Sequence, residues 1–138
     1  MIEQLIEFAT NHYLLVAAFV AVLILFLINE SRRGAPAVSI HEATQLINKQ
    51  QAVVLDLRSN AEFKAGHINE AVNLPYTSLA SRISELDKYQ GRPLILVCKM
   101  GQHSKAASRN LAKAGFEVKR LSGGMVDWTS ANLPLVKG

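Results

Sequence analysis

An uninterrupted apolar run near the start of the chain most constrains how this protein can fold. Residues 13–28 read YLLVAAFVAVLILFLI, and the 22 residues from Phe8 to Asn29 carry no formal charge. At a rise of about 1.5 Å per residue, a helix of that length reaches roughly 33 Å, which matches the hydrocarbon thickness of a bilayer. Residues 1–30 are therefore predicted to form an N-terminal single-pass transmembrane anchor.

Two other interpretations of the run are a cleavable signal peptide and a buried core helix. A signal peptide begins with basic residues, whereas this chain begins with Glu3 and Glu7 and has no Lys or Arg before the run. A core helix that is apolar on every face needs a larger protein around it than the roughly 105 residues that remain. Both alternatives are less favoured than a membrane span.

The charges on either side of the run predict its orientation. Arg32 and Arg33 follow it directly, and acidic residues precede it. Basic residues are retained on the cytoplasmic side of a membrane. We therefore expect a single-pass protein of the cell inner (plasma) membrane with its C-terminal domain in the cytoplasm.

Composition after the run limits the classes of ligand. All 15 Lys and Arg lie there with nine of the 11 acidic residues, and no basic stretch is interleaved with aromatic residues. An excess of about six positive charges is explained for most of these residues by a solvated basic surface, with anionic lipid or anionic substrates as the alternative. Nucleic-acid binding is not expected. The single cysteine permits no internal disulfide, and four scattered histidines give no metal-ligand spacing. We expect no metal and no cofactor.

The remainder reads as a linker, residues 31–37 (SRRGAPA), followed by one domain, residues 38–138. Ser39 is predicted to cap a helix that starts near His41, with Glu42 completing the capping box. Continuous apolar runs predict strands that are covered on both faces, as in a parallel sheet. Alternating strands and helices indicate an α/β layer sandwich with a mostly parallel sheet. The strands are expected at 52–57, 71–74, 94–98 and 118–121, and further helices at 61–65, 79–89, 105–113 and 125–130.

The only cysteine, Cys98, stands where an apolar strand ends and a glycine-containing loop begins. A nucleophilic cysteine needs surroundings that favour its thiolate. Here a helix is predicted to start near Ser104, and Lys99, Lys105 and His103 add positive charge. Gly101 allows the backbone angles that a ring of inward-facing amides requires. The alternative, that Cys98 is the last core residue of its strand, remains open on these residues alone.

Three segments together resemble a known family. The series from Asp56 to Pro75, within VVLDLRSNAEFKAGHINEAVNLP, resembles the first signature of rhodanese-like sulfurtransferase domains. VCKMGQHS resembles their active-site loop, and AGFEVKRLSGGMVDW resembles their closing segment. The resemblance covers about Val38 to Leu133. It implies a rhodanese-like three-layer sandwich, in which helices cover both faces of a five-stranded sheet.

The resemblance also implies a mechanism. Cys98 would take a sulfane sulfur from a donor such as thiosulfate and pass it on from a persulfide. The backbone amides of the loop would hold the anion, and the Ser104 hydroxyl would donate to the persulfide. Many members of the family have arginine where His103 stands, so weak activity on thiosulfate is expected. The loop residues implied in substrate binding are Lys99, Met100, Gly101, Gln102, His103 and Ser104.

Three other polar residues are candidates for a place near the pocket. Arg58 is assigned to substrate binding, because a cation near the strand ends would attract an anionic donor. Asp56 is at least as well explained by a structural ion pair. His67, between a glycine and an apolar strand, is interpreted as structural.

The leading hypothesis is a membrane-tethered sulfurtransferase whose partners are a small sulfur donor, a thiol or protein acceptor, and the membrane itself, with membrane proteins as further candidates. The alternative is a non-catalytic, membrane-anchored interaction module. A third hypothesis, redox sensing through Cys98, is weakened because the chain has no second cysteine to resolve a sulfenic acid.

Overall fold

The computed structural model describes residues 1–31 and 34–138. The chain divides into two compact units, Met1–Arg33 and Gly34–Gly138. Arg32 and Arg33, on which the predicted orientation partly depends, lie outside the described residues.

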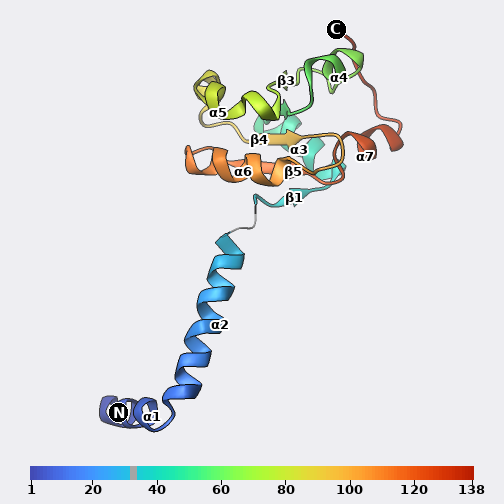
Figure 1. The fold of residues 1–138 in the computed structure, drawn as a ribbon. Helices are drawn as coiled ribbons and strands as arrows, with labels where there is room; N and C mark the ends of the chain where they lie inside the picture. The colour runs from blue at the N-terminus through green and yellow to red at the C-terminus, as the bar shows by residue number, and fades with distance from the viewer. Residues whose placement is uncertain (32–33) are drawn as a thin grey trace. The chain divides into compact units, whose positions relative to one another are not determined.

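The N-terminal unit contains two helices where the sequence predicted one. Helix α1 spans Ile2–Asn11 and helix α2 spans Tyr13–Ser31, and the chain turns between them (Figure 1). The predicted span, Phe8–Asn29, was therefore placed too early, because it crosses the break at His12. Within the described residues, one helix is long and apolar enough to cross a membrane, over Tyr13–Glu30, and none of that window is buried. A buried core helix is therefore not supported, and a membrane span or a signal sequence fits this helix.

The second unit is built on the predicted parallel sheet. Its five strands lie in the order β1-β5-β4-β2-β3, and every neighbouring pair is parallel. The register of β2 and β4 pairs Asp56 with Val97, so these two strands end side by side. The five-stranded α/β fold is thus confirmed. The strands are β1 (Ala37–Val38), β2 (Val53–Asp56), β3 (Val72–Asn73), β4 (Leu94–Val97) and β5 (Val118–Leu121).

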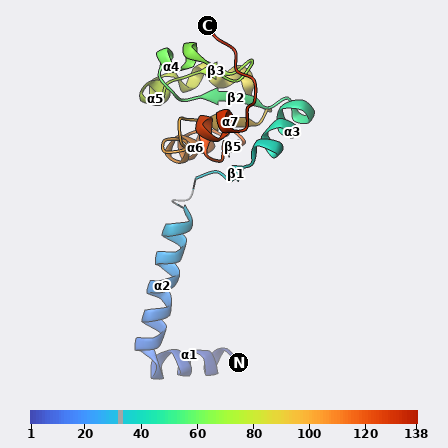
Figure 2. The ribbon, with the colours of Figure 1, turned by 90° about the vertical axis from the view of Figure 1, so that its right-hand side faces the viewer.

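Helices cover both faces of this sheet because its strands are apolar on both sides. Leu55, Leu96 and Cys98 belong to the core on one face, and Ile95 and Val97 belong to the core on the other. Helices α5 (Leu79–Arg82) and α6 (Ser104–Lys113) pack on the first face, while α3 (Ile40–Gln50) and α7 (Gly124–Ser130) pack on the second. Figure 2 shows α5 and α6 on the opposite side of the sheet from α3. Helix α4 (Asn60–Ala65) follows β2.

Local signals in the sequence located most helix ends correctly. The Ser39 hydroxyl caps α3 by accepting a hydrogen bond from the Glu42 amide at 3.1 Å. The segment 79–89, predicted as one α-helix, is instead a short α5 followed by a 3₁₀ helix over Ile83–Tyr89. Three residues per turn bring Ile83, Leu86 and Tyr89 to one side of that helix. All three pack in the core beneath it, which explains the difference.

The domain begins earlier in the structure than the sequence suggested. The Ala35 amide donates to Ser108 Oγ at 2.9 Å, and Arg120 Nε donates to the Ala35 carbonyl at 2.6 Å. Ala37 then pairs with Arg120 in the sheet. Residues 34–37, assigned to the linker from their glycine and proline content, are therefore part of the folded domain.

Candidate functional site

Cys98 lies at the carboxyl end of β4, where parallel α/β sheets bind their ligands. The loop that starts there is held by helix α7 from the other end of the domain. The amide of Met125 donates to the Cys98 carbonyl at 2.9 Å, and the amide of Val126 donates to the Lys99 carbonyl at 3.0 Å. A strand thus fixes one side of the cysteine, and the first turn of a helix fixes the other.

This contact with α7 requires a glycine at its first position. Gly124 has a positive φ of 60°, and a Cβ atom there would overlap the carbonyl oxygen of Cys98. Gly123, with a φ of 72°, precedes Gly124 and forms the turn that leads into α7. This turn lets α7 approach the cysteine loop.

Inside the loop, the Gln102 side chain contacts the thiol. Its Oε1 atom accepts a hydrogen bond from the Met100 amide at 3.0 Å and lies 3.7 Å from Cys98 Sγ. Cys98 is only 1% exposed, whereas Gln102 is exposed. One amide of the predicted anion cradle is therefore satisfied by the protein itself in this structure.

The Ser104 hydroxyl is also engaged within the loop. It is buried and donates to the Gly101 carbonyl at 3.0 Å. The implied hydrogen bond from Ser104 to a persulfide would therefore require this hydroxyl to rotate. Gly101 itself has a φ of 90°, which supports the sequence argument that the loop needs glycine at this point.

A cavity of about 410 Å³ adjoins the cysteine. Cys98, Lys99, Gln102, His103 and Arg58 all line it, so the structure brings these predicted residues together. The imidazole of His103 stacks on the ring of Tyr76, with 4.5 Å between the ring centres and planes 14° apart. The lining thus combines cationic groups and one carboxylate, that of Glu62, with an aromatic wall. Its remaining residues are Leu57, Ser59, Glu62, Pro75, Tyr76 and Thr77.

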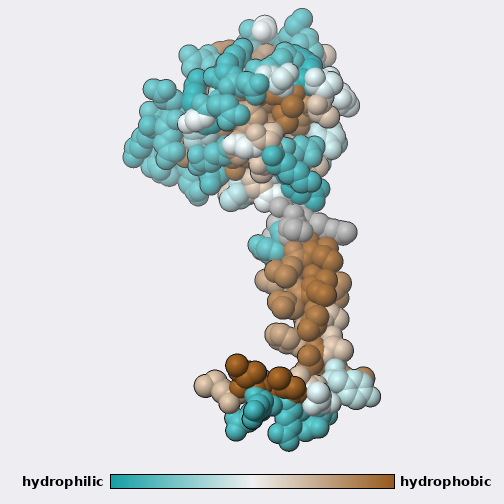
Figure 3. All heavy atoms as spheres, turned by 90° about the vertical axis from the view of Figure 1, so that its left-hand side faces the viewer, coloured by the Kyte–Doolittle hydropathy of each residue, from teal (hydrophilic) through white to brown (hydrophobic). Residues whose placement is uncertain are grey.

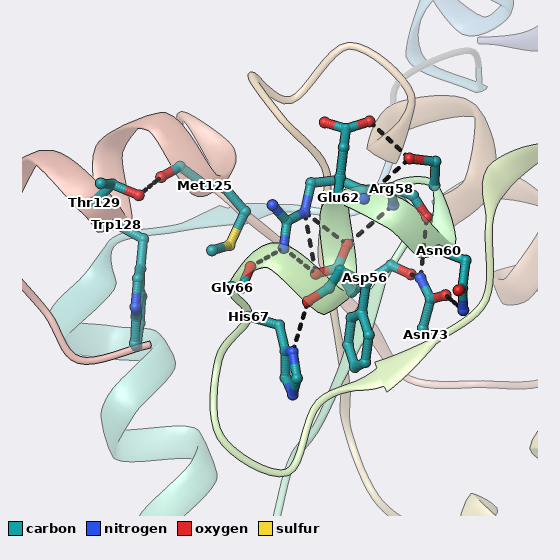
Figure 4. Close-up of polar contacts among 12 residues, drawn as sticks. Asp56, Arg58, Asn60, Glu62, Gly66, His67, Asn73, Met125, Trp128 and Thr129 are labelled. Carbon is teal, nitrogen blue, oxygen red and sulfur yellow. Dashed lines mark hydrogen bonds and ion pairs between the residues drawn. The ribbon is translucent and has the colours of Figure 1, made fainter. Parts of the chain in front are cut away.

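Arg58 lines this cavity but is tightly engaged on its other side (Figure 4). Its Nη2 atom lies 2.8 Å from Asp56 Oδ2 and donates to the Gly66 carbonyl at 2.7 Å, while Nε donates to Asp56 Oδ1. The Asn73 amide donates to the carbonyls of both Asp56 and Arg58. The structural ion pair considered for Asp56 is present, and Arg58 has a structural role together with its place in the cavity wall.

His67 and Trp128 belong to the packing of the domain. Nδ1 of His67 lies 2.7 Å from the Phe63 carbonyl, and since a carbonyl only accepts, this nitrogen carries the proton. The imidazole also stacks on the Phe63 ring at 3.7 Å. Trp128 is buried, and its indole donates to the Pro134 carbonyl at 3.4 Å. The tail beyond it is held by backbone hydrogen bonds between His67 and Val136, and Leu133 packs on the core, whereas Leu135 and Val136 are exposed.

The sequence analysis did not find Tyr76, Glu62 or α7 as parts of the site. Tyr76 follows β3, and the carboxyl ends of parallel strands meet at one edge of a sheet. The residues after Pro75 could therefore have been predicted as part of the site. The contacts of α7 had no comparable signal, because they join residues about 27 positions apart in the chain. Within residues 1–31 and 34–138, no cluster of three His, Cys, Asp or Glu side chains is placed to hold a metal ion.

A parallel α/β sheet that presents one loop-borne cysteine to a cation-lined cavity defines a class of domains suited to thiol chemistry on anions. Comparison with known proteins is more specific. Residues 39–131 match the family described as Rhodanese-like domain, and the chain belongs to this family.

Similar proteins divide into full-length and domain-length matches. The chain is 36% identical to YibN of Escherichia coli (strain K12) over 141 aligned residues, covering 99% of both proteins. It is 35% identical over 95 residues to the thiosulfate sulfurtransferase GlpE of Shewanella oneidensis, covering 68% of this chain and 92% of that one. The crystal structure of a rhodanese-related protein from Thermoplasma volcanium superposes with a TM-score of 0.67 at 24% identity, covering 73% of this chain and 97% of that one.

Proposed function

We propose that this protein is a sulfurtransferase that carries sulfur as a persulfide on Cys98. The observation that carries the proposal is the position of this thiol, at the end of β4 against a cavity lined by Lys99, His103 and Arg58. Family membership and the similarity to a thiosulfate sulfurtransferase support the same chemistry.

The reaction has two balanced steps. In the first, the Cys98 thiolate attacks the outer sulfur of thiosulfate, the S–S bond of the donor breaks, and sulfite leaves with the bonding electron pair. In the second, a nucleophilic acceptor, such as a thiolate or cyanide, attacks the terminal sulfur of the persulfide. The Cys98 thiolate then leaves, and the loop returns to its starting state.

The cavity suits an anionic donor, but its affinity for thiosulfate should be low. Lys99 supplies a point charge, and the loop amides supply hydrogen bonds to an anion. The guanidinium of Arg58 is shared with Asp56, and His103 cannot offer the bidentate fork of an arginine. Weak binding of thiosulfate follows, so a different donor is the better candidate for the cellular reaction.

We further propose that α2 anchors the protein in the inner membrane, with the domain in the cytoplasm. Support comes from the apolar, unburied window at Tyr13–Glu30, whose one charged residue is the terminal Glu30, and from the absence of Lys and Arg before it. Membrane fractionation tests the anchor, and mass analysis of the membrane-bound chain tests cleavage. Recovery of a chain that lacks α1 and α2 would support a signal sequence instead.

The sulfur-transfer proposal is tested by weighing the intact protein after incubation with several donors, including thiosulfate. The expected result is a gain of one sulfur atom that is absent from the Cys98→Ala variant and reversed by cyanide. If none of the donors gives a Cys98-dependent increase in mass, the enzymatic function is refuted.

A second candidate function, a non-catalytic interaction module, is favoured by one observation, the burial of the Cys98 side chain. The two functions differ in what they need from this residue. A sulfur carrier loses its cellular role in the Cys98→Ala variant, whereas an interaction module retains its role, because the loop contacts to α7 use only backbone atoms.

A further inference from the structure

Helix α1 is a separate helix and does not extend the apolar helix that follows it. The His12 amide closes α1 on the Phe8 carbonyl at 3.0 Å, and His12 itself has non-helical angles, φ −122° and ψ 39°. The Thr10 hydroxyl bonds back to the carbonyls of Ile6 and Glu7. Such back-bonding commonly bends a helix. The next helix, α2, then begins at Tyr13.

The two sides of α1 differ in chemistry, because residues three and four apart share a face of a helix. One face carries apolar side chains, and the opposite face carries Glu3, Glu7, Thr10 and Asn11. Leu5 is 64% exposed and Ile6 is 59% exposed. Figure 3 shows hydrophobic and hydrophilic sides on α1, whereas α2 is hydrophobic along its length. The apolar face consists of Ile2, Leu5, Ile6 and Ala9.

The length and charge of α1 decide which environment fits it. Ten residues reach about 15 Å as a helix, half of what a bilayer crossing needs. Carboxylates at Glu3 and Glu7 are costly in hydrocarbon, so the polar face must meet water. An amphipathic helix of this kind fits the boundary between lipid headgroups and acyl chains. Only His12 separates α1 from the candidate span, so a bilayer crossed by α2 supplies that boundary next to α1.

We propose that α1 lies in the plane of the membrane, at the non-cytoplasmic interface, with its apolar face in the acyl chains of the phospholipid leaflet. The inference rests on the proposed membrane anchor and is independent of sulfur transfer. Helix α1 contains Glu3 and Glu7 and no basic residue. Burial of apolar surface therefore drives its insertion, and attraction to anionic headgroups does not contribute.

Site-directed spin labelling of the full chain tests the proposal. Cys98→Ser provides a cysteine-free background for three variants with one cysteine each. Leu5→Cys and Glu7→Cys place labels on opposite faces of α1, and Val20→Cys places a label on α2. Each variant is reconstituted in phosphatidylcholine vesicles, and collision rates are measured with oxygen, which enters lipid, and with a water-soluble nickel complex. Thermal unfolding compared with the unlabelled chain verifies that each variant is folded.

The expected result is a several-fold lower nickel accessibility and a higher oxygen accessibility at Leu5 than at Glu7. Adding anionic lipid should leave this contrast unchanged. Equally high nickel accessibility at both positions, with Val20 protected, would place α1 in water, and equally low accessibility would show that neither face meets water; either result would overturn the proposal. Protection of Leu5 from both reagents would show that protein covers the face, as a second copy or a partner, and would also overturn it. Exposure of Val20 to nickel would instead refute the membrane anchor on which the proposal rests.

Discussion

At the scale of single residues, the side chain of Gln102 contacts the thiol of Cys98 and is a candidate to limit access to it. It contacts Cys98 Sγ and occupies the Met100 amide, yet it is itself exposed and free of buried packing. An incoming anion that uses the same amide must displace its carbonyl oxygen. We therefore expect that moving this exposed side chain away from the loop opens the buried cysteine to the adjoining cavity.

Replacing Gln102 by alanine should therefore raise the rate at which iodoacetamide alkylates Cys98 several-fold. Truncation removes the contact to Sγ and releases the Met100 amide. Alkylation is followed by intact mass, with Gln45→Ala, an exposed glutamine on α3 that contacts His41, as the matched control. An unchanged rate would show that Gln102 does not restrict access to the thiol.

A second residue-scale prediction concerns Gly124. Alanine at this position combines a strained positive φ with overlap of the Cys98 carbonyl, at an expected cost of about 2–4 kcal/mol in the free energy of unfolding. Sulfur transfer should fall with it, because the loop must shift. Gly91→Ala is the control: it has a φ of 84° but open space around it, so only the strain of about 1–2 kcal/mol remains. Equal urea midpoints for the two variants would contradict the role assigned to the contact with α7.

At the scale of secondary structure, one buried ion pair connects β2, β3 and the end of α4. Asp56 is 1% exposed, and its carboxylate holds the guanidinium that also binds the Gly66 carbonyl. Asn73 on β3 ties the same segment through two backbone carbonyls. These contacts shape the loop that forms one wall of the cavity.

Asp56→Ala should accordingly lower the free energy of unfolding by about 3–5 kcal/mol, because it leaves a nearly buried guanidinium without its carboxylate. Urea unfolding followed by Trp128 fluorescence measures the loss. Glu85→Ala, which breaks the exposed pair with Arg82, is the comparison and should shift the midpoint very little. A similar shift in both variants would mean that the Asp56 pair is as weak as a surface pair.

At the scale of the whole molecule, the two units should be separable, because each is compact by itself. A chain that starts at Gly34 retains the contacts of Ala35 with Ser108 and Arg120 and all five strands. We expect it to fold, to stay in the soluble fraction and to accept sulfur on Cys98 at the rate of the full chain in detergent. Centrifugation and intact mass measure these outcomes.

A chain that starts at Ser39 is the matched comparison. It lacks β1 and the Ala35 contacts, so it should unfold at a lower urea concentration than the chain that starts at Gly34. Equal stability would show that residues 34–38 contribute nothing to the domain and would place its boundary at Ser39, next to the Val38 that the sequence suggested.

Local patterns in the sequence determined much of this protein. The apolar run identified α2, the continuous apolar segments located β2 and β4, and Ser39 and Glu42 marked the start of α3. The position of Cys98 after a buried strand predicted a site at the carboxyl edge of the sheet, where the cavity lies. These features depend on near neighbours and on the period of the side chains, which a sequence displays directly.

Only the tertiary structure decided how distant segments meet. The break at His12, the docking of Ala35 on α6, the contact of α7 with the cysteine loop and the stacking of Tyr76 on His103 had no local signature. The same holds for the Gly66 carbonyl as a partner of Arg58. The contacts made by Ala35, α7 and Tyr76 join groups whose proximity depends on the order in which five strands assemble. The break at His12 and the contact of Arg58 with Gly66 lie within single segments of the chain. Apolar burial fixes that order for the chain as a whole and for no single segment.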